Sequence, residues 1–501
     1  MRTAPCTSLI LLATAAAALA APSFKIEPMP LPEGVDPQIG GVDVLPDGRV
    51  ATVFHRGEAL IFDPAKKTWS RFAEGLHEPL GVLAETTSSW LVMQRSELTR
   101  LRDTDGDGTA DDYETVFDGF GMTGNYHEFA FGPVKAKDGS LYISLNLASN
   151  GAGTAPEVRG PWSDIGALNR QQMVNSPDWK KQSKSAGRMY SRVAWRGWVL
   201  RLSPDGKQME PFACGFRSPD GIGFDADGNL LITDNQGDWR GTSPLYVVKR
   251  GGFYGQPASL VWRKDWKDGD PLKLPVAKLE SLRTVESARF PQGDLANSPT
   301  QPVVIPPSWG PYAGNVLIGE MNQKRMVRYL PDDVGGFRQG ALVPMFDGTS
   351  LGNGNHRLAF APDGTLWVGK THLSWAGDRG LVKIVPQDIA SAFTVMSCKQ
   401  GKAAQSQTLT LHLSQPLDST PPSIAIQRYG YAYHEDYGSP KTDPATVDPD
   451  SVMVSKDGRD LTITLKLTAG QIHELDLSKL KSRDGQPLEG KKVYYQAAKV
   501  L

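Results

Sequence analysis

The sequence predicts an all-β protein, a six-bladed β-propeller followed by a C-terminal immunoglobulin-like β-sandwich. Three observations predict this fold. A β-hairpin pattern recurs six times between residues 40 and 370 of the 501-residue chain. The 52 glycines and 37 prolines favour many turns between short strands. After Ile384, apolar and polar residues alternate at a period of two, as they do in the strands of a sandwich.

The first twenty residues are typical of a signal peptide. Arg2 provides a positive start, residues 8–20 are mostly apolar, and Ala18-Leu19-Ala20 is a small-residue cleavage site. The apolar run is short for a membrane span, and no later run is long enough to be one. We therefore expect an exported protein, either periplasmic or extracellular.

Charge and cysteine content narrow the function classes. The 54 Lys and Arg residues balance 55 Asp and Glu residues, so nothing in the composition favours a nucleic-acid partner. After removal of the signal peptide two cysteines remain, Cys214 and Cys398. They either pair in an oxidising compartment or stay as two buried thiols, and their spacing does not decide between these alternatives.

The repeated hairpins predict the propeller. Each repeat is a short apolar strand, a turn often written Asp-Gly, a second apolar strand, and then a further apolar strand. Where no insertion intervenes the spacing is roughly 40–50 residues, the length of a propeller blade. We expect the propeller to span residues 21–388. The six hairpins lie at 40–53, 79–94, 127–146, 219–234, 307–321 and 356–370.

Two insertions and a tail interrupt or follow this pattern. The insertions, about 147–196 and 256–301, are polar and rich in Gly, Pro, Ser and Trp. Long insertions on a rigid scaffold commonly build a binding face, although disordered decoration is the alternative. The tail, residues 389–501, is expected to be the immunoglobulin-like sandwich and to serve as an accessory or docking module.

The stretch "RDTDGDGTADDYE" (residues 102–114) matches a calcium-loop template. Oxygen ligands recur at alternate positions, a glycine permits the sharp turn, and a distal glutamate follows. Because the loop follows the outer strand of the second repeat, we expect it at the propeller's rim and the calcium to be structural. A solvated acidic turn is the alternative. The predicted ligands are Asp103, Asp105, Asp107, Thr109, Asp111 and Glu114.

Polar residues gather where strands of the repeats begin or end. Loops at these points ring the mouths of a propeller's channel, so a set with histidine and arginine suits a polar, carbohydrate-sized substrate. A water-filled channel would show a similar ring. The histidines are His55, His77, His127, His356 and His372. The other members are Arg56, Gln94, Arg95, Asn146, Arg217, Asp234, Asn235, Gln236, Glu320, Asn322, Arg357 and Lys370.

At this ring the sequence resembles a known family. "GFRSPDGIGFDADGNLLITDNQGD" (Gly215–Asp238) and "VKRGGFYGQP" (Val248–Pro257) are similar to segments of the soluble quinoprotein glucose/sorbosone dehydrogenases. These are secreted six-bladed propellers that oxidise sugars with pyrroloquinoline quinone (PQQ) and calcium. The closest resemblance is to a divergent secreted branch found with cytochrome c modules. That likeness implies a sugar or glycan ligand and a cytochrome c or other electron acceptor.

The resemblance implies roles for two residues. His127 in "NYHEFAFGP" matches the family's general base, and Arg217 in "RSPDG" matches an arginine that assists at the substrate or quinone oxygens. Neutral imidazole near pH 7 suits removal of a hydroxyl proton. A fixed cation stabilises negative charge that develops beside it.

The sequence departs from the family where the quinone would bind. The carboxylate that partners the base falls at Asn146, and the cations that grip the quinone's carboxylates fall near Asn322, Gly354 and His356. Weak cationic partners would hold three carboxylates poorly. Lys324, Arg357 and Lys370 are the nearby replacements. The implied cofactor contacts are therefore Asn146, Gln236, Lys324, His356, Arg357 and Lys370.

Three hypotheses of function follow. The first is an exported sugar dehydrogenase-like protein with a quinone-type acceptor. The second is a metal-dependent lactonase or hydrolase in which Glu320, Asn146 and Asp234 converge on a channel cation. The third is a carbohydrate- or protein-binding scaffold without catalysis.

Overall fold

The computed structural model describes residues 24–149, 159–163, 189–372, 377–418 and 420–501. The predicted signal peptide and much of the first predicted insertion lie outside these ranges. No helix within them is long and apolar enough to span a membrane.

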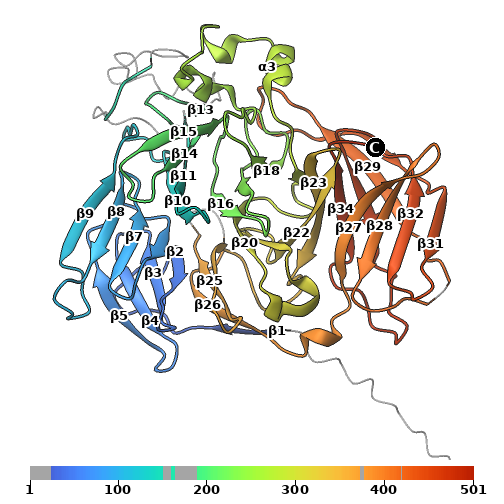
Figure 1. The fold of residues 1–501 in the computed structure, drawn as a ribbon, viewed down its shortest axis with the longest axis horizontal. Helices are drawn as coiled ribbons and strands as arrows, with labels where there is room; N and C mark the ends of the chain where they lie inside the picture. The colour runs from blue at the N-terminus through green and yellow to red at the C-terminus, as the bar shows by residue number, and fades with distance from the viewer. Residues whose placement is uncertain (1–23, 150–158, 164–188, 373–376, 419) are drawn as a thin grey trace, which may run out of the picture.

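Five antiparallel four-stranded sheets, together with four strands of an eight-stranded sheet, surround a common axis (Figure 1). The innermost strand of each sheet contacts the innermost strand of the next, from β2 round to β24 and back to β2. This closed ring is a six-bladed propeller, as predicted. In blades one to three the strands are β2 (Ile39–Val44), β3 (Val50–Phe54), β4 (Ala59–Asp63), β5 (Thr68–Ala73), β6 (Val82–Ala84), β7 (Ser89–Met93), β8 (Leu98–Arg102), β9 (Asp112–Phe117), β10 (Ala130–Lys135), β11 (Leu141–Leu145), β14 (Trp198–Leu202) and β15 (Met209–Cys214). In blades four to six they are β16 (Gly221–Phe224), β17 (Leu230–Thr233), β18 (Ser243–Val248), β19 (Ala288–Phe290), β20 (Pro299–Val304), β21 (Val316–Glu320), β22 (Met326–Val334), β23 (Phe337–Met345), β24 (Asn355–Phe360), β25 (Leu366–Lys370), β26 (Gly380–Pro386) and β1 (Phe24–Pro28).

Each blade has one more strand than the three of the predicted repeat. The outer strands of blades one, two and six, β5, β9 and β1, are partly exposed, so an apolar repeat pattern does not reveal them. Those of blades four and five, β19 and β23, are mostly buried. The outer strand of blade six comes from the other end of the propeller. Strand β1 pairs antiparallel with β26, and the ring of Phe24 lies 4.9 Å from that of Trp309 and 5.0 Å from that of Phe346. The chain thus closes its own ring.

The tail forms two sheets that share one apolar core. One sheet contains β27 (Val395–Lys402), β28 (Gln407–Leu413), β32 (Asp460–Leu465) and β31 (Ser451–Val454). The other contains β34 (Lys492–Ala497), β33 (Gln471–Asp476), β29 (Ala425–Tyr431) and β30 (Lys441–Thr446). Leu411 and Ile463 from the first sheet pack with Ile426 and Leu475 from the second. The tail is therefore a β-sandwich, and its immunoglobulin-like topology stays a prediction.

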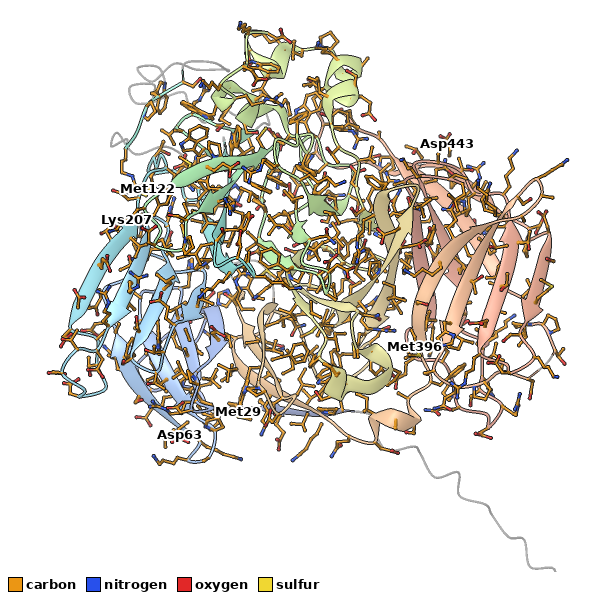
Figure 2. The ribbon with its side chains drawn as sticks, in the orientation of Figure 1. Met29, Asp63, Met122, Lys207, Met396 and Asp443 are labelled. Carbon is orange, nitrogen blue, oxygen red and sulfur yellow. The ribbon has the colours of Figure 1, made fainter. Side chains whose placement is uncertain are left out.

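The sandwich continues a propeller blade. Strand β23 pairs with β34, so blade five and the second tail sheet form one eight-stranded sheet. Side chains fill the space between the blades and between the sandwich sheets (Figure 2). Cys214 lies in the propeller and Cys398 in the sandwich, and both are buried free thiols. The alternative of a disulfide between them is wrong.

The second predicted insertion is ordered and mostly non-strand. It contains two short 3-10 helices, η2 (Pro257–Trp262) and η3 (Pro271–Lys273), and the helix α3 (Val276–Leu282). Trp262 Nε1 donates a hydrogen bond to Ser191 Oγ at 2.8 Å, which joins this insertion to the end of the first. The remaining short elements are β12 (Ala148–Ser149), β13 (Met189–Tyr190), η4 (Pro307–Tyr312) and η5 (Ile389–Ser391).

Candidate active site

One end of the propeller carries the candidate site. In an antiparallel blade, the loop before the first strand and the loop after the second lie at the same end. His127 precedes β10, Asn146 follows β11, and Arg217 precedes β16, so neighbouring blades three and four present them at that end. Two backbone bonds join these segments, from Asn146 N to Phe129 O (3.0 Å) and from Leu147 N to Arg217 O (3.2 Å).

His127 is held as a neutral imidazole. Burial, followed by the positive charges of Arg217 and Arg95, lowers the pKa of His127 to about 4. Within the described part of the chain, its buried Nδ1 atom has no hydrogen-bond partner. The ring of Tyr126 lies 4.6 Å from the imidazole, centroid to centroid. The backbone bonds from Asn146 and Leu147 place the His127 segment beside the segment of Arg217.

Arg217 is fixed on several sides. Its Nε atom donates to Asp238 Oδ1 at 3.0 Å, and its backbone N–H donates to Asp234 Oδ2 at 2.8 Å. A Cβ atom at Gly237 would lie 1.9 Å from Arg217 Nε, so only glycine leaves room for this side chain. The guanidinium carbon lies 5.2 Å from the centre of the Tyr437 ring. The cation is therefore positioned before any ligand binds.

Asn146 lies against the same two segments. Its Nδ2 atom donates to Ser218 Oγ at 2.9 Å, next to Arg217 in the chain. Its buried Oδ1 atom has no hydrogen-bond partner among the described residues. A buried polar atom without a partner costs free energy, so His127 Nδ1 and Asn146 Oδ1 are candidates for contacts with a hydroxylated ligand.

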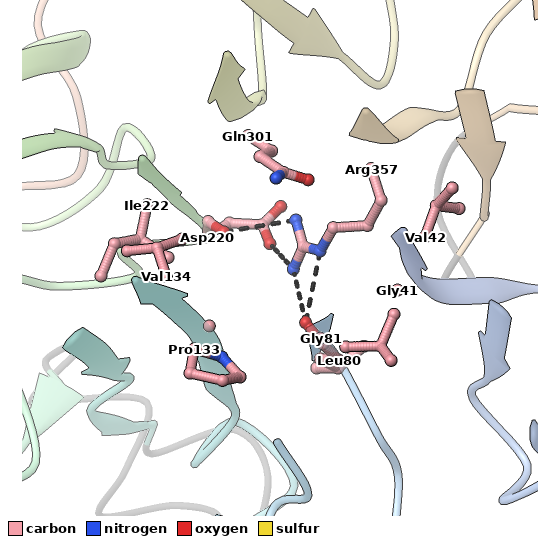
Figure 3. A pocket seen from close by; sticks show the side chains of 12 residues that line it. Gly41, Val42, Leu80, Gly81, Pro133, Val134, Asp220, Ile222, Gln301 and Arg357 are labelled. Carbon is pink, nitrogen blue, oxygen red and sulfur yellow. Dashed lines mark hydrogen bonds and ion pairs between the residues drawn. The ribbon is translucent and has the colours of Figure 1, made fainter. Parts of the chain in front are cut away.

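The structure places His356 and Arg357 elsewhere, on the axis. Arg357 Nη2 donates to Asp220 Oδ1 at 2.9 Å, and its Nε donates to the carbonyl oxygen of Leu80 (Figure 3). The same Nε atom also donates to Gly40 O. His356 Nε2 lies 3.0 Å from the same Asp220 oxygen. Burial raises the pKa of Asp220, but His356 and Arg357 outweigh burial and hold it at about 2. These buried residues link inner strands across the channel and leave a cavity of about 30 Å³.

Of the other implied cofactor contacts, Lys370 and Gln236 are hydrogen-bonded within the protein and Lys324 is exposed. Lys370 donates to the backbone oxygens of Leu351 and Asn353, and burial lowers its pKa to about 8. Gln236 Nε2 donates to Gly241 O at 3.1 Å. Lys324 is exposed in the turn between β21 and β22. Since Arg357 and Lys370 are already bonded internally, these residues do not fit the predicted grip on the three carboxylates of PQQ.

The carboxylates of the predicted hydrolase metal site accept hydrogen bonds from the protein itself. The Glu320 carboxylate accepts hydrogen bonds from the backbone N–H groups of Asn297, Ser298, Asn322 and Gln323. The Asp234 carboxylate accepts from Ser218 N and Arg240 Nε as well as from Arg217 N. These carboxylates hold loops together. The oxygens of Glu320 and Asp234 that the hydrolase hypothesis assigns to a metal are therefore already hydrogen-bonded within the protein.

The predicted calcium loop is the hairpin turn between β8 and β9. Ligand oxygens of Asp103, Asp105 and Asp107 lie within 4.8 Å of one another, and they form the only such His, Cys, Asp or Glu group in the described ranges. Glu114 does not join them, because its carboxylate pairs with Arg100 at 2.9 Å and also with Arg102. Asp111 accepts from Thr104. The prediction that Glu114 is a calcium ligand is therefore wrong. Pairing of β9 with β8 places Glu114 opposite Arg100. The backbone N–H of Thr109 donates a hydrogen bond to Asp107 Oδ1.

Several neighbours of the site were not singled out from the sequence. Glu78 pairs with Arg95 at 2.6 Å and lies 3.9 Å from His55, and Asp238 holds Arg217. Asp238 ends the "TDNQGD" motif, and its charge is the one local signal for a pairing with Arg217. Tyr437 comes from the sandwich, and nothing local in the sequence connects it to blade four.

Comparisons with known proteins give one family match and several solved structures. Residues 63–160 match a family described as a domain of unknown function (DUF7133), and no curated protein matches the chain. A putative oxidoreductase (glucose dehydrogenase) from Thermus thermophilus is 16% identical over 72% of this chain and 100% of its own, with a TM-score of 0.48. The PQQ-bound aldose sugar dehydrogenase from Streptomyces coelicolor is 16% identical over 74% and 100%, with a TM-score of 0.48. The apo aldose sugar dehydrogenase from Escherichia coli is 14% identical over 73% and 100%, with a TM-score of 0.46.

Proposed function

We propose that this is an exported, sugar dehydrogenase-like protein that binds a sugar or sugar derivative at His127, Arg217 and Asn146. One observation carries the proposal: a neutral imidazole with an unpartnered, buried Nδ1 atom shares its surroundings with a fixed arginine. Export is proposed from the signal-like first twenty residues.

The site residues suit the first step of alcohol oxidation. Neutral His127 accepts the proton of a sugar hydroxyl, and the Arg217 guanidinium stabilises the negative charge left on the oxygen. The amide of Asn146 orients a second hydroxyl through its unpartnered Oδ1 atom. Oxidation then needs an electron acceptor. A quinone-type acceptor and a cytochrome c partner belong to the proposal, although the predicted grip on PQQ is not formed.

The loop of Asp103, Asp105 and Asp107 is proposed to bind calcium structurally. Carboxylate oxygens at alternate positions are the ligands that calcium prefers. The loop joins the two outer strands of blade two, away from the innermost strands that ring the axis. Calcium there would stabilise a hairpin and would take no part in the reaction.

A sugar-binding scaffold without turnover is the second candidate. It is favoured by the internal hydrogen bonds of Arg357 and Lys370, which use the cations expected to hold a quinone. The same residues, His127, Arg217 and Asn146, would bind the sugar. The two candidates therefore differ only in the presence of an electron acceptor.

Reconstitution separates these candidates. The purified protein is mixed with PQQ and calcium, and the visible spectrum and dye reduction are recorded with mixed aldoses. Turnover that is lost in His127→Ala and kept in His412→Ala, a partly exposed histidine of the sandwich, supports the dehydrogenase. Sugar binding without chromophore or turnover supports the scaffold. Turnover that survives His127→Ala contradicts the proposed base.

A further inference from the structure

A loop of the sandwich reaches the candidate site. Residues 432–440, here called the sandwich loop, join β29 to β30 and lie against the turn after β17. Three backbone bonds fasten the two segments: Trp239 N to His434 O (3.0 Å), Gly438 N to Gly237 O (3.0 Å) and Ser439 N to Gly241 O (2.9 Å). The turn that carries Asp238, the partner of Arg217, is therefore bonded to the C-terminal module.

Side chains hold the sandwich loop in place. The Tyr433 hydroxyl donates to Gly255 O at 2.6 Å, and its ring lies 5.2 Å from the ring of Trp239. The guanidinium carbon of Arg283 lies 4.6 Å from the centre of the Tyr433 ring. These contacts fix the loop's position on the propeller, so a side chain that it presents is preorganised.

Two exposed tyrosines flank the proposed catalytic pair. Tyr437 is 66% exposed although its ring centre lies 5.2 Å from Arg217 Cζ, and Tyr126 is 52% exposed although its ring lies 4.6 Å from that of His127. Large aromatic side chains usually bury most of their surface. One exposed ring thus lies beside the cation and one beside the base.

We propose that Tyr437 is a sugar-binding platform, through which the C-terminal sandwich completes the propeller's site. A cyclic sugar has a face of C–H groups and a rim of hydroxyls. The negative face of an aromatic ring attracts such C–H groups, while convergent polar groups bind the hydroxyls. The ligand class is therefore a pyranose, alone or within a short oligosaccharide, and not an acyclic polyol. This inference rests on the proposed function.

The test is a binding titration with named sugars. Calorimetry measures D-glucose, cellobiose, maltose and the acyclic polyol sorbitol against the full-length mature protein. Tyr437→Ala is expected to weaken binding of the best cyclic sugar at least tenfold with an unchanged melting temperature. Tyr437→Leu, which keeps apolar bulk, should lose affinity similarly, and Tyr437→Phe should stay within threefold. Tyr113→Ala is the matched control, because Tyr113 is 45% exposed on the outer strand β9.

The outcomes distinguish the platform from the proposed function. If His127→Ala abolishes binding while Tyr437→Ala and Tyr437→Leu keep wild-type affinity, the platform is overturned and the proposed function stands. If both Tyr437 variants lose binding and His127→Ala does not, the platform stands and the proposed function is overturned. Tightest binding of sorbitol would overturn the pyranose assignment. Absence of binding by all four probes would overturn both.

Discussion

Arg357 and Asp220 meet across the propeller axis, with Arg357 Nη2 2.9 Å from Asp220 Oδ1. Arg357 comes from the inner strand of blade six and Asp220 from the segment entering blade four. Both are buried, and His356 shares the same carboxylate oxygen. This ion pair joins blades four and six, which are not neighbours in the ring, so residues predicted to hold a cofactor instead hold the fold.

Breaking the axial pair should destabilise the propeller strongly. Arg357→Met leaves the buried Asp220 carboxylate without one of its two side-chain partners, His356 and Arg357, and removing one member of a buried pair costs about 3–5 kcal/mol. Urea denaturation of the mature protein measures the change. Arg49→Ala, which breaks the exposed pair with Asp47, is the control and should change stability by less than about 1 kcal/mol. Equal effects of both variants would contradict a structural role for the axial pair.

Stability should fall in acid because of Asp220. Its pKa is about 2 in the folded chain against an ordinary value of 3.8, so its contribution is complete above pH 3.8 and is lost as pH falls toward 2. The difference corresponds to about 2 kcal/mol. Asp220→Asn should be less stable at pH 7 and should show a shallower loss between pH 4 and 2. Denaturation midpoints across this range check the prediction, and parallel curves for both proteins would contradict it.

The N-terminal strand should be required for ring closure. Phe24→Ala removes a ring packed on Trp309 and Phe346, and burial of such a side chain contributes about 1.5–3 kcal/mol. Deleting residues 24–28 would uncover the edge of β26, which favours aggregation. Thermal melting and light scattering measure both effects. Lys25→Ala, on the same strand but exposed, is the control, and a Phe24→Ala melt matching it would refute the closure argument.

Calcium should stabilise the β8–β9 hairpin through the three aspartates. Added calcium is expected to raise the melting temperature of the wild type, and Asp105→Asn should reduce calcium affinity by about tenfold or more. Glu114→Gln should leave affinity within a few-fold, because Glu114 is paired with Arg100 and Arg102. Calorimetry with calcium chloride measures the affinities. If Glu114→Gln loses more calcium affinity than Asp105→Asn, Glu114 is a calcium ligand and the prediction is contradicted.

The hairpins could be predicted because their information is local. Alternating apolar residues and Asp-Gly turns, as in residues 219–234, define each pair of strands within a few residues. The outer strand β9 carries no such signal, since its residues are intermediate or exposed. Closure by β1 and fusion of the tail to blade five depend on pairings such as Leu342 with Tyr494, which only tertiary structure defines.

The sequence predicted where the side chains of the site lie along the repeats better than it predicted what they bind. Both arginines lie near the start of an inner strand, Arg217 before β16 and Arg357 within β24. Their partners differ, because Arg217 pairs with Asp238 after β17 whereas Arg357 pairs with Asp220 of blade four. Position along a repeat does not specify which neighbour a long side chain reaches. Tyr437 lies over two hundred residues from Arg217 in the chain, and only the fold brings them together.

The pKa of His127 tests most directly whether His127 and Arg217 share one site. NMR titration of the ring protons of the wild type should give a midpoint near pH 4, and Arg217→Gln should move it upward toward 6.5 because a repelling charge is removed. Arg49→Gln, far from the site on an exposed turn, should leave it unchanged. A wild-type midpoint near 6.5, or no change in Arg217→Gln, would contradict the shared site and the proposed chemistry with it.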